Sequence, residues 1–202
     1  MATVVSTLFI SLDGVAEIDP AWHFPYFDDA MGAGVGEDYE DVDVLVLGRV
    51  TYDSFAGAWP DREAAGGDDA SFAQQLGDTR KLVATRGSQE LGWRNVERTD
   101  DVVAAVRALK DDPSVGKVLV AGSLSVVRQL LDAGLLDELR LFVHPVAART
   151  GERLFADADT IQPFALLRAD PYPAGVIKVV YAPAALPGAA TYDDAKEHLP
   201  DG

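Results

Sequence analysis

A basic and a hydroxyl side chain follow the end of an apolar run in the segment LGRVTYDSF, residues 47–55. Gly48 falls at the turn after the run DVDVLVLG, and Arg49 and Thr51 fall at the start of the helix expected next. Backbone N–H groups at a helix start favour an anion. Arg49 adds a charged fork suited to phosphate, and Thr51 adds a hydroxyl. The alternative is that Arg49 makes a surface ion pair and Thr51 only caps the helix.

Two further strand ends carry groups of the same kind. KLVATRG places Thr85 and Arg86 after one apolar run, and KVLVAGSLSVV places Gly122, Ser123 and Leu124 between another run and a helix. A glycine at such a turn lets a phosphate approach the backbone closely, although a tight turn alone would also use Gly122. The carboxyl ends of strands line the ligand crevice of an open α/β sheet. The three ends together predict a diphosphate-binding site.

Other catalytic patterns are weak. Ser123 in AGSLS lacks the second glycine of a G-x-S-x-G elbow, and the spacing of His23, His144 and His198 does not suggest a zinc site. The glycine pattern MGAGVGED, residues 31–38, precedes a strand instead of following one, and its acidic end would repel a pyrophosphate. We expect a helix end and a loop there, and no metal site.

The elements that must position these residues alternate along the first two thirds of the chain. Helices are expected in TDDVVAAVRALKDD, which starts with acidic residues, and in SLSVVRQLLDAG, which ends at a glycine. Short runs that are apolar on both faces suit a parallel sheet covered by helices. The expected strands are Val4–Leu12, Val42–Gly48, Lys81–Thr85 and Lys117–Ala121.

The last third of the chain changes character. DELRLFVHPVAA, FALLRADPYP and GVIKVVYAPA read as strands without long helices between them, and the turn signal DPYPAG predicts a hairpin of the last two. Residues 60–79 are expected to begin as a surface loop with a short helix. We expect one domain over residues 1–183 and a loosely held tail over residues 184–202, which is small, polar and rich in Pro and Gly.

Composition excludes several classes of function. The net charge of −16 argues against binding to nucleic acid, which needs clustered Lys and Arg, and against an anionic membrane surface. The chain has no cysteine, so disulfides, thiol catalysis and thiolate metal sites are absent. The N-terminus alternates like a strand and lacks a basic segment before its apolar residues. These features predict a cytoplasmic protein with a small-molecule ligand.

Several segments, taken in order, resemble the dihydrofolate reductase superfamily. The closer branch is the reductase domain of riboflavin biosynthesis and its stand-alone relatives. The segments are SLDGVAE, LGRVTYDSF, KLVATR and VLVAGSLSVVRQLLDAGLLDELRLFVHPVAARTGERLF, and the resemblance covers roughly residues 4–182. It implies a dihydrofolate-reductase-like α/β fold, with a mixed, mostly parallel sheet flanked by helices and a C-terminal antiparallel hairpin.

The resemblance also implies NADPH as the cofactor and hydride transfer as the chemistry. The chain departs from the superfamily in having Ala121-Gly122 where dihydrofolate reductases have a Gly-Gly pair, and one glycine in AARTGERLF. No zinc deaminase motif accompanies the domain. The implied cofactor-binding residues are Gly48, Arg49 and Thr51 for the phosphates, Thr85 and Arg86 for the adenosine 2′-phosphate, and Gly122, Ser123 and Leu124 for the pyrophosphate.

The acceptor side rests on fewer residues. WHFPYFD is similar to the W-x-L-P-x-D stretch whose acid binds the pterin in dihydrofolate reductases, but Asp28 arrives one residue late, which on a helix is about 100° of rotation. Asp13 is the other candidate for a catalytic acid, or else a turn residue before Gly14. Trp22 is the candidate substrate-binding residue, as a lid over the ring, or else a core residue.

These observations lead to one expected function and one alternative. We expect an NADPH-dependent reductase that transfers a hydride to a small heterocyclic or related unsaturated substrate. The alternative is a nucleotide-binding module of the same fold without catalytic activity. A homodimer is also expected, because LLDELRLFVHPVAA supplies an apolar late strand and an antiparallel edge needs cover, unless the C-terminal tail provides it.

Overall fold

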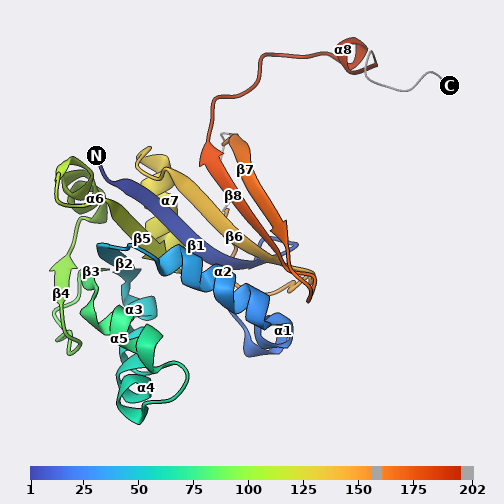
Figure 1. Cartoon of the computed structure of the whole chain (residues 1–202). Coiled ribbons are helices and arrows are strands. Elements are labelled where there is room, and N and C mark those ends of the chain that lie inside the picture. Colours follow the sequence, from blue (N-terminus) through green and yellow to red (C-terminus); the bar gives the residue numbers. More distant parts are fainter. Residues whose placement is uncertain (156–160, 197–202) are drawn as a thin grey trace.

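The computed structural model describes residues 1–155 and 161–196, which form an eight-stranded mixed sheet flanked by helices (Figure 1). The order of the strands is β4-β3-β2-β5-β1-β6-β8-β7. The first six strands in this order pair in parallel, and β6, β8 and β7 pair antiparallel. The strands are β1 (Thr3–Ser11), β2 (Val44–Gly48), β3 (Arg80–Ala84), β4 (Val96–Thr99), β5 (Lys117–Ala121), β6 (Glu138–His144), β7 (Phe164–Pro171) and β8 (Ile177–Pro183).

Helices cover both faces of the sheet. Alternate residues of the strands point to opposite faces, so Val4 and Leu8 of β1 pack with α6 and α7, whereas Val5 packs with α2, α3 and α5. The helices are α1 (Pro20–His23), the 3-10 turn η1 (Phe24–Tyr26), α2 (Asp29–Tyr39), α3 (Arg49–Ala56), α4 (Trp59–Ala65), α5 (Ala70–Asp78), α6 (Val102–Asp111), α7 (Leu124–Asp132) and α8 (Tyr192–Lys196).

The expected mixed, mostly parallel sheet with a C-terminal hairpin is confirmed. The strands of the hairpin, β7 and β8, pair antiparallel, and β8 adds to β6. The late apolar strand β6 is internal, because it lies between β1 and β8. The free edge at this end of the sheet is therefore β7 and not the strand on which the expectation of a dimer was based.

Two expectations about local structure are wrong. Residues 60–79 belong largely to two helices, α4 and α5, instead of a loop with one short helix. The glycine-rich residues 31–38 lie wholly inside α2. One of these glycines lies against the hairpin, because a Cβ at Gly34 would lie 2.0 Å from Oη of Tyr172 in its turn and would displace that side chain.

A buried ionic group holds α2 against the sheet beside Gly34. Asp38 of α2 has no exposed surface and accepts hydrogen bonds from Thr7 Oγ1 at 2.7 Å and Arg140 Nη1 at 2.8 Å. Lys178 Nζ lies 2.8 Å from the same carboxylate and donates to the carbonyl of Gly34 at 2.7 Å. Each charged side chain of this group therefore has a partner of opposite charge, which offsets the cost of removing it from water.

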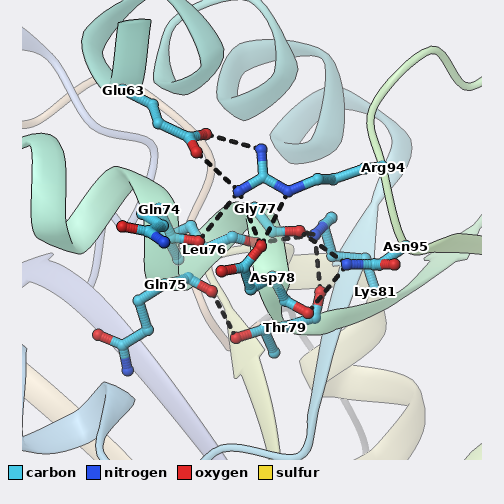
Figure 2. Close-up of polar contacts among 10 residues, drawn as sticks. All are labelled: Glu63, Gln74, Gln75, Leu76, Gly77, Asp78, Thr79, Lys81, Arg94 and Asn95. Carbon is cyan, nitrogen blue, oxygen red and sulfur yellow. Dashed lines mark hydrogen bonds and ion pairs between the residues drawn. The ribbon is translucent and has the colours of Figure 1, made fainter.

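Lys81 at the start of β3 anchors the end of α5, as Figure 2 shows. Its side chain is fully buried, and Nζ donates to the carbonyls of Leu76, Gly77 and Thr79 at 2.7–2.8 Å. Burial lowers the pKa of Lys81 to about 8. Its three carbonyl acceptors favour the protonated form, because only an ammonium group has three hydrogens to donate. This single side chain satisfies carbonyls that a helix end leaves without partners.

The chain beyond the sheet leads away from the body of the molecule to α8 (Figure 1). The last strand ends at Pro183, and residues 184–194 are exposed. No helix among the described residues is both long enough and apolar enough to cross a membrane.

Candidate cofactor and substrate site

The structure brings the three predicted strand ends side by side. β2 lies between β3 and β5 and is parallel to both. Gly48 pairs with Ala84, the residue before Thr85, and Val46 pairs with Val120, two residues before Gly122. Parallel strands end at one edge of the sheet, which is where open α/β folds bind ligands.

A hydroxyl group joins the loops after β2 and β5. The N–H of Gly48 donates to Ser123 Oγ at 2.8 Å, and Ser123 Oγ lies 2.9 Å from Thr51 Oγ1. A Cβ at Gly122 would lie 3.4 Å from Cγ2 of Thr51. We call Gly48, Thr51, Gly122 and Ser123 the turn cluster. It leaves little room for side chains where the two loops meet.

Two helices start at the turn cluster without side-chain caps. Gly48 precedes α3 and Ser123 precedes α7, and neither position has a side-chain hydrogen bond to the helix that follows. The first N–H groups of a helix lack intrahelical partners and carry a partial positive charge. Gly122 and Ser123 both have left-handed backbones, with φ of 58° and 59°. For serine this conformation costs about 1–2 kcal/mol, so the turn is held in a shape that the chain does not prefer.

Arg49 is the first residue of α3, and its guanidinium lies against Asp53 one turn further along the helix. Its Nε donates to both oxygens of Asp53 at 2.8–2.9 Å, so the surface ion pair considered as an alternative does form. Its Nη1 is buried and has no hydrogen-bond partner among the described residues. An unpaired enclosed donor on a permanent cation is costly to the fold, and an anion could bind it only after the side chain moves, because the atom has no exposed surface in this structure.

The remaining cofactor candidates differ in their surroundings. Thr85 Oγ1 accepts from the N–H of Gly87 at 3.1 Å, so its hydroxyl supports the turn after β3. Arg86 is exposed at the same turn. Leu124 is half-buried against the core under α7, which indicates a packing contribution at the helix start. Arg86 is the one charged residue of these three, and its side chain is exposed to solvent.

A hollow of about 370 Å³ lies beside α3, between that helix and the loop before β4. Tyr52, Asp53, Glu90 and Trp93 are among its lining residues, and the N–H of Trp93 donates to Oη of Tyr52 at 3.0 Å. The lining carboxylate of Glu90 disfavours a phosphate inside the hollow, whereas that of Asp53 is already paired with Arg49. An anion is therefore better placed at the turn cluster than here.

Asp13, the first candidate acid, is engaged by its neighbours. Its carboxylate accepts from Ser11 Oγ at 2.7 Å and from the N–H groups of Ala148 and Arg149 at 2.8–2.9 Å. Arg153 Nη2 lies 3.7 Å away. The hydrogen bond from Ser11 is the main cause that lowers the pKa of Asp13 below its usual value. These contacts tie the loop after β1 to the loop after β6, and they favour an ionised, positioning carboxylate over a proton donor.

Asp28, the second candidate acid, caps a helix. It precedes α2 and accepts from the N–H of Met31 at 2.8 Å and from the N–H of Ala174 at 3.1 Å. Trp22 lies in α1, half-buried, with its ring centroid 5.1 Å from that of His144. The structure thus gives Asp28 a role in joining α2 to the hairpin turn, and it places Trp22 at the ends of β1 and β6.

Sequence reasoning missed a pair of histidines in this region. His23 Nδ1 lies 3.2 Å from His144 Nε2, and both side chains are buried. Burial is the main cause that lowers the pKa of His23 to about 4 and lowers that of His144. The third histidine, His198, lies outside the described residues. With 121 positions between the two partners, no local pattern in the sequence could have revealed the pair.

Comparisons with known proteins agree with this architecture. YyaP of Bacillus subtilis, an uncharacterized protein, is 24% identical over 189 residues, which span 88% of this chain and 93% of that protein. A pyrimidine reductase-like protein of Corynebacterium diphtheriae superimposes with a TM-score of 0.64 at 17% identity, covering 91% of this chain and 92% of the other. RibD of Acinetobacter baumannii gives 0.63 at 16% identity, covering 92% of this chain and 59% of RibD. The model of the RibD C-terminal domain matches residues 2–177, and the chain therefore belongs to the RibD C-terminal domain family, within the dihydrofolate-reductase-like superfamily.

Proposed function

We propose that this chain is an NADPH-dependent reductase that transfers a hydride to a small heterocyclic or related unsaturated acceptor. The observation that carries the proposal is the turn cluster, where two uncapped helix starts meet and Arg49 is the first residue of α3. Such groups suit the pyrophosphate of a dinucleotide. Membership of the RibD C-terminal domain family, with a pyrimidine reductase-like protein among the similar structures, supports the same chemistry.

The residues present fit a dinucleotide, and each contributes in a different way. Gly48 and Gly122 let the two loops meet closely, since a Cβ at either position would contact Ser123 or Thr51. Arg49 would add charge to the pyrophosphate, and Arg86, exposed at the end of β3, would face the 2′-phosphate that distinguishes NADPH from NADH. When bound, the cofactor supplies the hydride.

On the acceptor side, the loops after β1 and β6 would hold the reacting ring in place. Asp13 joins these loops through the N–H groups of Ala148 and Arg149. The bridge between Val15 and Arg153 joins them a second time. Trp22 stands beside them as the candidate lid. In this proposal Asp13 acts by positioning, because its lowered pKa makes it a poor acid at neutral pH.

The test is a pair of titrations followed by turnover. NADPH and NADH are titrated against the protein, and NADPH oxidation is then followed with a panel of dihydropterins, pyrimidine ribitylamines and quinones. The proposal expects NADPH to bind more tightly than NADH and at least one acceptor to be reduced. NADPH binding without turnover of any acceptor would favour the nucleotide-binding module. Equal affinities for the two cofactors would overturn the assignment of NADPH.

We further propose that the protein is a homodimer formed along β7. This strand is the free edge of the sheet, and Leu166 and Leu167 on it are each 56% exposed. An edge strand with exposed apolar side chains is a site for pairing unless something covers it. A second copy would cover it through a two-fold interface. Light scattering at micromolar concentration tests this, and a monomeric mass would overturn it.

A further inference from the structure

The histidine pair, His23 and His144, is buried among aromatic rings at the ends of β1 and β6. His23 is 5% exposed and His144 is not exposed at all. The ring of Phe9 lies 4.3 Å from that of His23, and Phe142 of β6 lies 5.3 Å from Phe9. Within the described residues, no charged side chain makes a hydrogen bond or ion pair with either histidine. Burying two polar rings among aromatic side chains costs free energy, so their presence here calls for a structural or functional explanation.

The hydrogen bonds of the pair fix which nitrogens carry protons. His144 Nδ1 lies 3.0 Å from the carbonyl of Phe142, which can only accept, so Nδ1 carries the hydrogen. In neutral His144, Nε2 is then an acceptor, and His23 Nδ1 donates to it at 3.2 Å. Neutral His23 keeps a free lone pair on Nε2. That atom makes no hydrogen bond within the part of the chain that the structure describes.

The surroundings of His23 are suited to a flat ring. Phe24 and Phe27 lie 5.2 and 5.6 Å from the imidazole, centroid to centroid, and they are 63% and 45% exposed. Exposed aromatic side chains beside a polar atom that solvent can reach are typical of small-molecule sites, where apolar walls bind the ring and a few polar groups orient it. Here the polar atom would be a hydrogen-bond acceptor.

This group lies at the same edge of the sheet as the turn cluster. The N–H of Gly122 donates to the carbonyl of Thr7, which pairs with Ala121, so β5 ends beside the middle of β1. Ser11, four residues further along β1, pairs with His144. Four residues of a strand span about 13 Å. The histidine pair is therefore displaced along β1 from the proposed pyrophosphate site, on the side where an acceptor would lie.

We propose that His23 is the residue that recognises the acceptor, through a hydrogen bond that Nε2 accepts from a ring N–H or amino group. His144 is its positioning residue, because it holds the tautomer that leaves this lone pair free. The acceptor class is then an uncharged, planar heteroaromatic ring with a hydrogen-bond donor, which would pack against the exposed rings of Phe24 and Phe27. The inference rests on the proposed reductase function.

The experiment measures binding, not turnover. Lumazine, which carries ring N–H groups, and 1,3-dimethyllumazine, in which methyl groups replace them, are titrated by calorimetry at pH 7 against the wild type, His23→Phe and His23→Gln. In the wild type, lumazine is expected to bind at least about tenfold more tightly, which is the loss expected when one such hydrogen bond is removed. His23→Phe keeps a ring of similar shape but no acceptor, so the preference should disappear. The carbonyl of His23→Gln should restore part of it.

Several outcomes would overturn the inference. These are equal binding of the two lumazines by the wild type, no binding of either, and an unchanged preference in His23→Phe. The ligand pair tests the wild type directly, so the inference remains testable even if a variant fails to fold. Titration of NADPH against the same proteins separates the two proposals. NADPH binding without a lumazine preference overturns only the role of His23, whereas absence of NADPH binding overturns the proposed function.

Discussion

The hydroxyl groups of Ser123 and Thr51 lie 2.9 Å apart, although 72 residues separate them in the sequence. Ser123 precedes α7 and Thr51 lies in the first turn of α3, so this contact joins the starts of two helices. The N–H of Gly48 donates to the same Ser123 oxygen. The relative position of two N–H-rich helix starts thus depends on one serine side chain.

Ser123→Ala is therefore expected to weaken both the fold and cofactor binding. Two hydrogen bonds are lost, which should lower the free energy of unfolding by about 1–2 kcal/mol and NADPH affinity by about tenfold. Urea denaturation and fluorescence titration measure the two effects. Ser125→Ala is the matched control, since Ser125 is exposed two residues later in α7. Similar results for both variants would show that the hydroxyl contact does not position the site.

Arg86→Gln should reduce NADPH binding and leave NADH binding nearly unchanged. A charge-assisted hydrogen bond to the 2′-phosphate is worth about 1.5–3 kcal/mol, which corresponds to about ten- to a hundredfold in affinity. Arg107→Gln serves as control, because Arg107 is an exposed arginine of α6 that lies away from the strand ends. Equal loss of both cofactors in Arg86→Gln would indicate a contact with the pyrophosphate instead of the 2′-phosphate.

Lys81→Met is expected to destabilise the protein by about 3 kcal/mol, because buried carbonyls at the end of α5 lose their donor. Arg80→Met provides the comparison from the adjacent position. Arg80 makes an exposed ion pair with Glu97, and such pairs contribute about 0–1 kcal/mol. Thermal and urea unfolding measure both variants. Equal effects would mean that the three contacts of Lys81 contribute no more than a surface pair.

The parts of the fold that the sequence predicted are those with strong local signals. β2, β3 and β5 are apolar on both faces, and DPYPAG marks the hairpin turn. β4 was missed because its residues, VERT, are polar and lie at the sheet edge, where burial imposes no pattern. The glycines of residues 31–38 disfavour a helix by propensity, but they lie in α2, where Gly34 contacts the hairpin through Tyr172 and Lys178.

The residues of the candidate site also fall into those that the sequence could reveal and those that it could not. Glycine, arginine and hydroxyl residues at strand ends could be found because topology brings the ends of parallel strands together. Asp28 was chosen from the similarity of WHFPYFD to a family motif, and Asp13 from its position before Gly14 in SLDGVAE, whereas only the folded structure shows that backbone N–H groups occupy both carboxylates. The contact between His23 and His144 depends on how α1 folds onto β6, which no local pattern contains.

Asp13→Asn tests whether this carboxylate positions loops or donates a proton. An amide oxygen can accept only part of the three hydrogen bonds that Asp13 receives, so turnover should fall by about tenfold as the loops loosen. NADPH affinity should change little. If Asp13 only positions, the pH profile of kcat/KM between pH 5 and 8 keeps its shape in the variant. If the variant loses one of the pKa values that shape this profile, or if its turnover falls by about 10²–10⁴-fold, Asp13 acts as a catalytic acid after all. Asp28→Asn is the comparison at the other candidate acid.

The histidine pair should make stability depend on pH in the mildly acidic range. The pKa of His23 is about 4 in the folded protein and 6.5 for an unperturbed histidine, so between these values the unfolded chain binds a proton that the folded chain does not. Stability is therefore full above pH 6.5 and is lost as the pH falls toward 4. Linkage gives a loss of about 2 kcal/mol between pH 7 and pH 5 from His23 alone.

Carboxylates contribute to acid unfolding too, so the informative quantity is the difference between the wild type and His23→Phe, measured by urea denaturation at both pH values. The variant should lose about 2 kcal/mol less than the wild type over this interval. If both lose the same amount, His23 does not titrate as a buried neutral ring, and the tautomer that leaves its Nε2 free would lose its support.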